Sequence, residues 1–225
     1  MAYDFLGLTN DICRRLNETE LTAAQFPTAV GVYSQLKDSV NAAVRDINQS
    51  HFQWPFNHNF DTITLTAGQM RYPLPANSKY VDFDTVRLQR STTPLVENAR
   101  RLTQLSYDEY VSRFIDDEYK LASQGSAPEY VVRAQDSDII FAPNPDAAYS
   151  IKYEYYMYPA DLVNDTDVPT IPYRYRHVIV DGGMYYAYMF RDNIESARTS
   201  FQKFEDGMKR MRTQNVNENL YARAV

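Results

Sequence analysis

The chain is poor in cysteine, glycine and histidine, and these shortages exclude several kinds of site. Its 225 residues include 1 Cys, 7 Gly and 3 His. The single thiol, Cys13, allows no internal disulfide and no cysteine-based zinc cluster, and it suits a reducing compartment. His51, His58 and His177 have no cysteine or carboxylate set at ligand spacing. The sequence therefore predicts no metal site and no cofactor.

Catalytic and nucleotide-binding motifs are also lacking. Gly125 stands alone between serines, so the sequence has no phosphate-cradling loop and no dinucleotide fingerprint. No serine or cysteine has an evident base beside it, which argues against the common nucleophilic mechanisms. We therefore expect no catalytic residues and a protein that is not an enzyme.

An excess of positive charge and a long apolar run are missing as well. The formal net charge is −6 and the pI is about 5.1, whereas a protein that wraps nucleic acid needs a basic stripe for the phosphates. No window approaches ~18 consecutive apolar residues, so we expect no membrane span. The first residues have no basic start and no apolar core, which predicts that no signal peptide is present.

What the chain does have is a change of hydrophobic period at the joint Trp54-Pro55-Phe56. Before the joint, apolar residues recur at helical spacing over about 4–16 and 30–50. After it, apolar and polar residues alternate through most of 60–158, which predicts strands. Helical spacing returns near Ile171.

This order of elements predicts an α+β fold in which the two ends of the chain form one helical bundle. We expect residues 1–57 and 168–213 to build the bundle and 58–167 to form an inserted, antiparallel β-rich module. The polar stretch after Arg212 cannot drive folding alone. We therefore expect residues 214–225 to be an extended C-terminal tail that binds a partner.

Two features of the C-terminal helices predict how they pack. The helix near 172–192 contains Gly182-Gly183, which is tolerable where another backbone comes close, and we expect the second or the last helix to be that neighbour. In the last helix, the apolar residues follow one another by 3, 4, 3, 4 and 3, as in an a/d seam: Ile194, Ala197, Phe201, Phe204, Met208 and Met211. We expect this seam to pack against the chain's own helices.

An acidic stretch within a predicted helical segment at 105–121 has three interpretations. It consists of Asp108, Glu109, Asp116, Asp117 and Glu118. Such a run is usually a solvated helix face. It would also suit a carboxylate pair for glycoside cleavage, or the wall of a channel that repels a passing polyanion.

A tyrosine-rich strand near 148–158 is the second candidate for binding chemistry. Alternation places Tyr153 and Tyr155 on the apolar face, so we expect them in the core. Tyr156 and Tyr158 are freer to contact sugars or bases.

The order of elements resembles that of the head-to-tail adaptor proteins of short-tailed bacteriophages, also called tail tubular protein A or head-completion proteins. One shared feature is the N-terminal helical pair that ends at Gln53-Trp54-Pro55-Phe56. A second is the pattern T-x-T-L-x-x-G-x-x-x-Y-x-L-P, a predicted hairpin that runs here from Thr62 to Pro75. The third is the return to long helices with a polar C-terminal extension.

The resemblance implies a structural virion protein of the phage neck, assembled in the host cytoplasm. Such adaptors form a ring of about twelve subunits beneath the portal protein. They contact the tail nozzle or tube protein below, and DNA passes through the channel without sequence-specific binding. Carried over by position in the chain, the portal-binding residues would be Arg210, Arg212, Leu220, Tyr221, Arg223 and Val225.

Other functions stay open on the residues alone. A tail-associated glycan hydrolase would use the acidic stretch at 108–118, and a glycan- or receptor-binding module would use exposed tyrosines. A DNA-packaging component is disfavoured by the net charge of −6.

Overall fold

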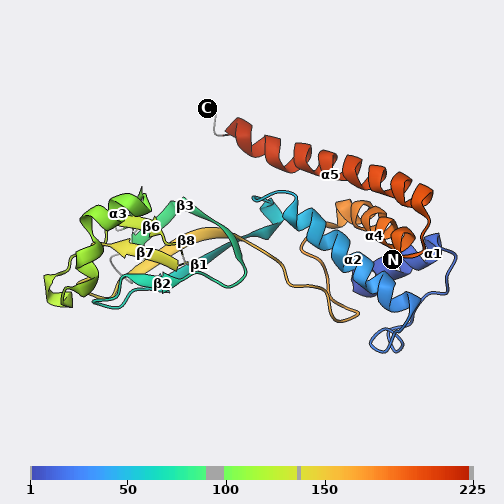
Figure 1. Cartoon of the computed structure of the whole chain (residues 1–225), viewed down its shortest axis with the longest axis horizontal. Coiled ribbons are helices and arrows are strands. Elements are labelled where there is room, and N and C mark those ends of the chain that lie inside the picture. The colour runs from blue at the N-terminus through green and yellow to red at the C-terminus, as the bar shows by residue number, and fades with distance from the viewer. Residues whose placement is uncertain (1, 90–98, 136–137, 223–225) are drawn as a thin grey trace. The chain divides into compact units, whose positions relative to one another are not determined.

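The structure is a computed structural model that describes residues 2–89, 99–135 and 138–222 (Figure 1). The chain divides into two compact units. The helical unit combines the residues up to Asn57 with those from Tyr158 onward, and the sheet unit is His58–Met157. The α+β class is confirmed, with one bundle formed by the N- and C-terminal helices.

The helical unit contains four α-helices, two from each end of the chain. Helix α4 lies between α2 and α5, and α1 packs against α2 and α4 (Figure 1). Asp4 begins the first helix, because its carboxylate accepts the Gly7 N–H at 2.7 Å. The bounds are α1 Phe5–Arg15, α2 Val32–Gln49, α4 Arg176–Phe190 and α5 Ile194–Ala222.

The double glycine of α4 lies where the helices approach most closely. A Cβ on Gly182 would lie 2.8 Å from the Cβ of Ala43 on α2 and 2.8 Å from the ring of Phe204 on α5. A Cβ on Gly183 would overlap the end of the Ile12 side chain on α1. The prediction that the second or the last helix packs here is confirmed, since both touch Gly182.

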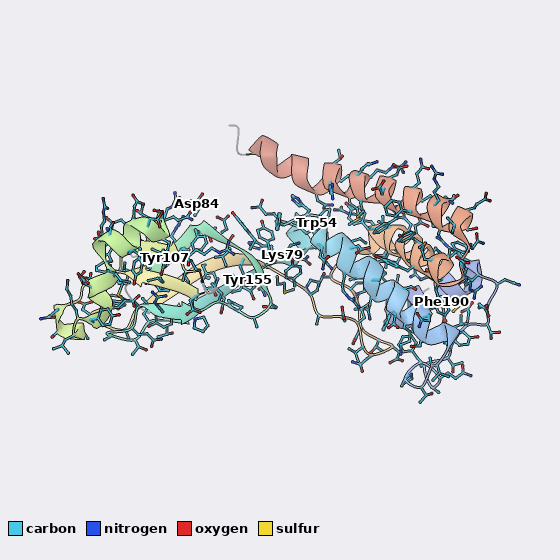
Figure 2. The ribbon with its side chains drawn as sticks, viewed as in Figure 1. Trp54, Lys79, Asp84, Tyr107, Tyr155 and Phe190 are labelled. Atoms are coloured by element: carbon cyan, nitrogen blue, oxygen red, sulfur yellow. The ribbon has the colours of Figure 1, made fainter. Side chains whose placement is uncertain are left out.

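The aromatic joint after α2 is part of the same core. The Trp54 side chain is fully buried, and its Nε1–H donates to the Ile47 carbonyl at 2.7 Å (Figure 2). Its ring stacks on Phe56 with 5.2 Å between centroids. The indole therefore covers the C-terminal end of α2 as the chain leaves the helical unit.

The apolar seam of α5 is buried along one line only. Ala197, Phe204 and Met211 are buried, whereas Ile194 and Phe201 are 68% and 40% exposed. The Phe201 ring still lies 5.0 Å from the Tyr185 ring of α4. The prediction that the seam packs against the chain's own helices is therefore confirmed, with α4 as the neighbour, although the side chain of Ile194 at its beginning stays exposed.

Helix α5 also differs from the expected extended tail. It remains helical from residue 213 to Ala222, through a stretch that contains no glycine or proline. Two side chains of this stretch bond to the Tyr175 hydroxyl, which donates to Gln214 Oε1 at 3.0 Å and accepts from Asn215 Nδ2 at 2.8 Å. Polar side chains that looked like a spacer thus hold the helix to the bundle.

The segment that returns from the sheet unit joins the helical unit earlier than expected. The sheet unit ends at Met157, not at residue 167. The backbone N–H and carbonyl of Leu162 bond to the Asn41 side chain, both at 3.0 Å. The Phe5 N–H donates to the Asp167 carbonyl at 2.8 Å. These contacts place residues 158–167 against α1 and α2.

The sheet unit consists of two four-stranded sheets with strand orders β1-β8-β3-β4 and β2-β7-β6-β5. All neighbouring strands are antiparallel except β5 and β6, which are parallel. The bounds are β1 His58–Thr64, β2 Arg71–Pro73, β3 Ser78–Gln89, β4 Ala99–Arg101, β5 Thr103–Leu105, β6 Tyr130–Arg133, β7 Asp138–Ala142 and β8 Ser150–Met157.

The apolar residues of the sheet unit form two layers. One cluster joins side chains of both sheets, such as Val81 and Phe141. It also includes Tyr155 of β8, which is labelled in Figure 2. The other covers the opposite face of the second sheet and includes Tyr110 of helix α3 (Tyr107–Arg113). The central strand β7 is therefore apolar on both faces, with residues 139–142 all buried.

The hairpin predicted at 62–75 forms the expected turn, but its two strands do not pair with each other. Gly68 has φ of +84°, as the turn requires. However, β1 pairs with β8 and β2 pairs with β7, so the turn carries the chain from one sheet to the other. Leu65 and Tyr72 nevertheless enter the same core, because the two sheets face each other across it. The bulge expected near Asp84 is confirmed as a register shift between Asp82 and Arg87.

Candidate docking surface on the C-terminal helix

Helix α5 is anchored to the start of α4 by a polar contact centred on Asn215. This side chain is 8% exposed, and its Nδ2 donates to the Met211 carbonyl and to the Tyr175 hydroxyl, both at 2.8 Å. Its Oδ1 accepts from Arg174 Nη2 at 2.9 Å. A buried amide with all these partners fixes the orientation of α5 on the bundle. Beyond it, the helix continues through residues 216–222.

The solvent side of α5 is basic, although the whole chain is acidic. Between residues 198 and 212 there are five Lys or Arg and two Asp or Glu. The five basic residues are all exposed: Arg198, Lys203, Lys209, Arg210 and Arg212. The helix therefore suits a partner surface with negative charge.

The residues predicted to bind the portal protein fall into four groups. Arg210 is exposed on α5. Arg212 donates through Nη2 to the Ser50 carbonyl at 2.9 Å, so it also supports the C-terminal end of α2. Leu220 and Tyr221 lie in the last turn of α5, but their side chains lie outside the described part of the chain. Arg223 and Val225 lie outside the described residues altogether.

A basic cleft at the start of α4 adjoins this anchor, and it was not predicted. It is shallow and open to solvent, and it is lined by Asp11, Arg15, Tyr173, Arg174, Arg176, His177 and Val180. Arg176 pairs with Asp11 at 2.5 Å, and Arg15 pairs with Asp181 at 2.6 Å. Arg174 is shared with the Asn215 anchor. The alternating aromatic and basic residues from Tyr173 to His177 are the sequence signal that could have found the cleft.

The acidic stretch at 108–118 is largely committed to local structure. Glu109 forms a capping box with Ser106, and these hydrogen bonds lower the pKa of the Glu109 carboxyl. Asp117 is 9% exposed and pairs with Lys120 at 2.5 Å. Glu118 accepts from Arg71 Nε at 2.8 Å. These partners argue against a pair of free catalytic carboxylates, and they show that three of the five acidic side chains stabilise the local structure.

Tyr110 ties this acidic cover to the sheet beneath it. Its side chain is fully buried, and its hydroxyl donates to the Glu118 carboxylate. Burial first, and then the neighbouring Glu118, raises the pKa of the Tyr110 hydroxyl. The hydroxyl therefore stays protonated and serves as a structural donor.

The histidines and the tyrosine-rich strand have mainly structural surroundings. His58 lies 2.9 Å from the Glu154 carboxylate, and His51 packs edge-on against Trp54. Across the described ranges, no three His, Cys, Asp or Glu residues are grouped so that they could hold a metal ion. Tyr153 and Tyr155 are 1% and 6% exposed, which confirms their prediction as core residues. Also within the described residues, no helix is long and apolar enough to cross a bilayer.

Comparison with known protein families identifies the family of this chain. The model of the family described as SU10 adaptor protein matches residues 3–224 of the chain. No curated protein matches it. The matched range includes both units and the whole of α5.

Proposed function

This chain belongs to the SU10 adaptor protein family, and on that premise we propose that it joins the portal protein to the tail nozzle or tube in the phage neck. Membership of the family makes it a phage structural adaptor. The joint that it makes, the ring that it forms and the passage of DNA through that ring are our proposal. This role needs no catalytic step, and assembly would take place in the host cytoplasm.

The observation that carries the proposal is the anchored, basic helix α5. Asn215, in the later part of α5, is bound to Arg174 just before α4, and the exposed face of the helix carries Lys209 and Arg210. A helix that is already formed and fixed loses less conformational entropy on binding than an extended tail would. We propose that α5 enters a groove of the portal protein, with Leu220 and Tyr221 in its last turn as apolar anchors.

The remaining predicted contacts fit the same arrangement. Arg210, Arg223 and Val225 would contact the portal directly. Arg212 would act partly through the end of α2, because it already binds the Ser50 carbonyl. The basic cleft beside Arg174 adjoins the anchor of α5 and would extend this surface.

We also propose that portal rings template the adaptor ring. About twelve subunits would close through head-to-tail lateral contacts, so that many weak bonds add up to a stable assembly. The isolated protein should then be mainly monomeric in size-exclusion chromatography with light scattering. A stable ring formed without portal would contradict this point. DNA would pass through the channel without specific binding, which agrees with the net charge of −6.

The decisive experiment removes the C-terminal end of α5 but keeps Asn215, which anchors the helix. A chain that ends at Asn215 keeps the contacts to Arg174 and Tyr175 and should fold normally. It should no longer co-sediment with portal rings, and undiminished co-sedimentation would contradict the proposal. Arg210→Ala should weaken portal binding without a change in stability. Arg212→Ala is the matched variant, because it should also destabilise the helical unit through the lost Ser50 contact.

A further inference from the structure

We infer that Tyr119 and Leu121 form a docking point for a tail protein that offers an apolar pocket with a basic rim; this rests on the adaptor function proposed above. The two side chains are 85% and 71% exposed. Among the described residues of the sheet unit, four large apolar side chains are exposed, namely Phe60, Val111, Tyr119 and Leu121. Three of them lie in the segment 107–121, and Tyr119 and Leu121 are only two residues apart in the chain.

Hydrogen bonds from a buried side chain and from a neighbouring turn fix the backbone at Lys120, between the two exposed side chains. Asn144 is 1% exposed, and its Nδ2 donates to the Lys120 carbonyl at 3.0 Å. The Lys120 N–H donates to the Asp117 carbonyl at 3.2 Å, and its Nζ pairs with the Asp117 carboxylate at 2.5 Å. Short helical turns flank this point, η3 Ile115–Tyr119 before it and η4 Ala122–Gln124 after it.

Gly125 shows how closely this support is packed. A side chain at that position would overlap the Asn144 carbonyl, and the same carbonyl accepts the Ser126 N–H at 2.9 Å. The segment 117–126 is therefore fastened to the loop that follows β7 at several points. Because the backbone is already ordered, docking of Tyr119 and Leu121 costs little conformational entropy.

The surroundings of the pair define the chemistry of the occupant. The segment 106–124 contains five acidic and two basic residues. Glu109, Asp117 and Glu118 have partners within the unit, whereas Asp108 and Asp116 are exposed, and Asp116 lies three residues before Tyr119. A negative rim repels nucleic acid phosphates and favours a protein surface with Lys or Arg around an apolar pocket. Tyrosine is also enriched at the centres of protein interfaces.

A second copy of this chain is a poorer occupant than a tail protein. The basic face of α5 is assigned to the portal in the proposed function, so the basic cleft of the helical unit is the other described surface to consider for an acidic, apolar segment. Its Arg176 and Arg15 are already paired with Asp11 and Asp181 at 2.5 and 2.6 Å. Binding there would exchange existing ion pairs for new ones, with little net gain.

The test compares the double variant Tyr119→Ser with Leu121→Ser against Phe60→Ser. Phe60 is 63% exposed on β1 and serves as the matched control for loss of an exposed ring on the same unit. The probe is the purified tail nozzle or tube protein of the same phage, added to adaptor bound to portal rings. The double variant should bind it at least about 10-fold more weakly, with unchanged portal binding, while the control binds as the wild type does. Equal thermal unfolding would show that all three proteins fold alike.

The remaining outcomes separate this inference from the proposed function. Equal tail-protein binding by the wild type and the double variant would overturn the docking point and leave the adaptor role intact. A double variant that loses portal binding or ring formation instead would also overturn it, because the occupant would then be the portal or a second copy. A wild-type chain that binds no portal would overturn the adaptor function itself.

The acidic rim gives an independent measurement on the same surface. Asp108→Asn with Asp116→Asn should slow association with the tail protein and flatten its dependence on salt. Both residues are exposed, so this variant should keep the fold. An unchanged salt dependence would contradict the basic rim assigned to the partner.

Discussion

The helical unit and the sheet unit build their cores from the chain in opposite ways. The core of the helical unit joins residues as far apart as Phe5 and Met211. The two apolar clusters of the sheet unit come from the continuous stretch 58–157. The helical unit therefore needs both ends of the chain to form its core, whereas the sheet unit forms its core from one continuous segment.

This difference suggests an order of folding. The first strand of the sheet unit, β1, pairs with the last, β8, and His58 lies opposite Tyr156. Once the sheet unit is formed, the two points at which the chain returns to the helical unit are neighbours. Formation of the sheet unit has then already closed the long loop between the two helical segments, so their packing loses less chain entropy. The folded sheet unit thus holds the ends of the two helical segments, at residues 57 and 158, close together.

The largest expected effect comes from dividing the chain at the boundaries of the sheet unit. A fragment of residues 58–157 should fold alone, with a cooperative unfolding transition by circular dichroism. A fragment of residues 1–157 should fold only in its sheet unit, because it lacks residues 158–225, which supply 10 of the 22 buried residues of the helical core. Native-like helix content in residues 1–57 of the longer fragment would contradict the contrast between the units.

Replacement of Trp54 should come next in size. Trp54→Ala removes a fully buried indole and its hydrogen bond to the Ile47 carbonyl. We expect it to lower the free energy of unfolding of the helical unit by about 3–5 kcal/mol. Hydrogen exchange should show faster opening in α2 and α4 but unchanged protection in β7 and β8. Equal loss of protection in both units would mean that they unfold as one.

The double glycine of α4 offers a smaller and more local test of close packing. Gly182→Ala places a Cβ 2.8 Å from both Ala43 and the Phe204 ring, and neither neighbour can easily move. It should destabilise the protein by about 1–3 kcal/mol despite its better helix propensity. Gly183→Ala meets only the flexible end of Ile12 and should change stability by less than about 1 kcal/mol. Urea unfolding of the two variants makes the comparison, and equal effects would contradict it.

The sequence predicted those parts of the fold that local patterns determine. The change of period at Trp54 marks the end of the first helical segment, and Gly182 marks a close helix contact. The pairing of strands was not predictable in this way. Leu65, directly after β1, and Tyr72 of β2 enter one core from the sides of two different sheets, and alternation gives the same pattern for a hairpin as for facing strands.

The candidate docking surface was only partly visible in the sequence for a similar reason. The position of the last helix and its basic residues could be read locally. The anchor between Asn215 and Arg174 could not, because it joins residues that no periodicity relates. A polar run such as 213–219 is typical of a tail, and only the tertiary contact explains why its beginning stays helical.

The smallest expected effects concern two carboxylates that play corresponding roles in the two units. In the helical unit, Asp167 accepts the N–H groups of Val163 and Asn164 at 2.7 and 2.8 Å, and these bonds lower the pKa of the Asp167 carboxyl below its ordinary 3.8. In the sheet unit, the capping box with Ser106 lowers the pKa of Glu109 below its ordinary 4.5. A carboxyl whose pKa is lowered by folding stabilises the folded state above its ordinary pKa. That contribution is lost as the pH falls through the lower, folded value.

Asp167→Asn and Glu109→Gln should therefore each lower the unfolding temperature slightly at neutral pH. Each gap from the wild type should be complete above pH ~5 and should close in more acidic solution, because the wild-type carboxyl is then protonated and resembles its amide replacement. Hydrogen exchange at neutral pH should assign the first effect to the helical unit and the second to the sheet unit. If either substitution weakened both units equally, the independence of the two cores would be contradicted, because neither carboxylate touches the other unit's core.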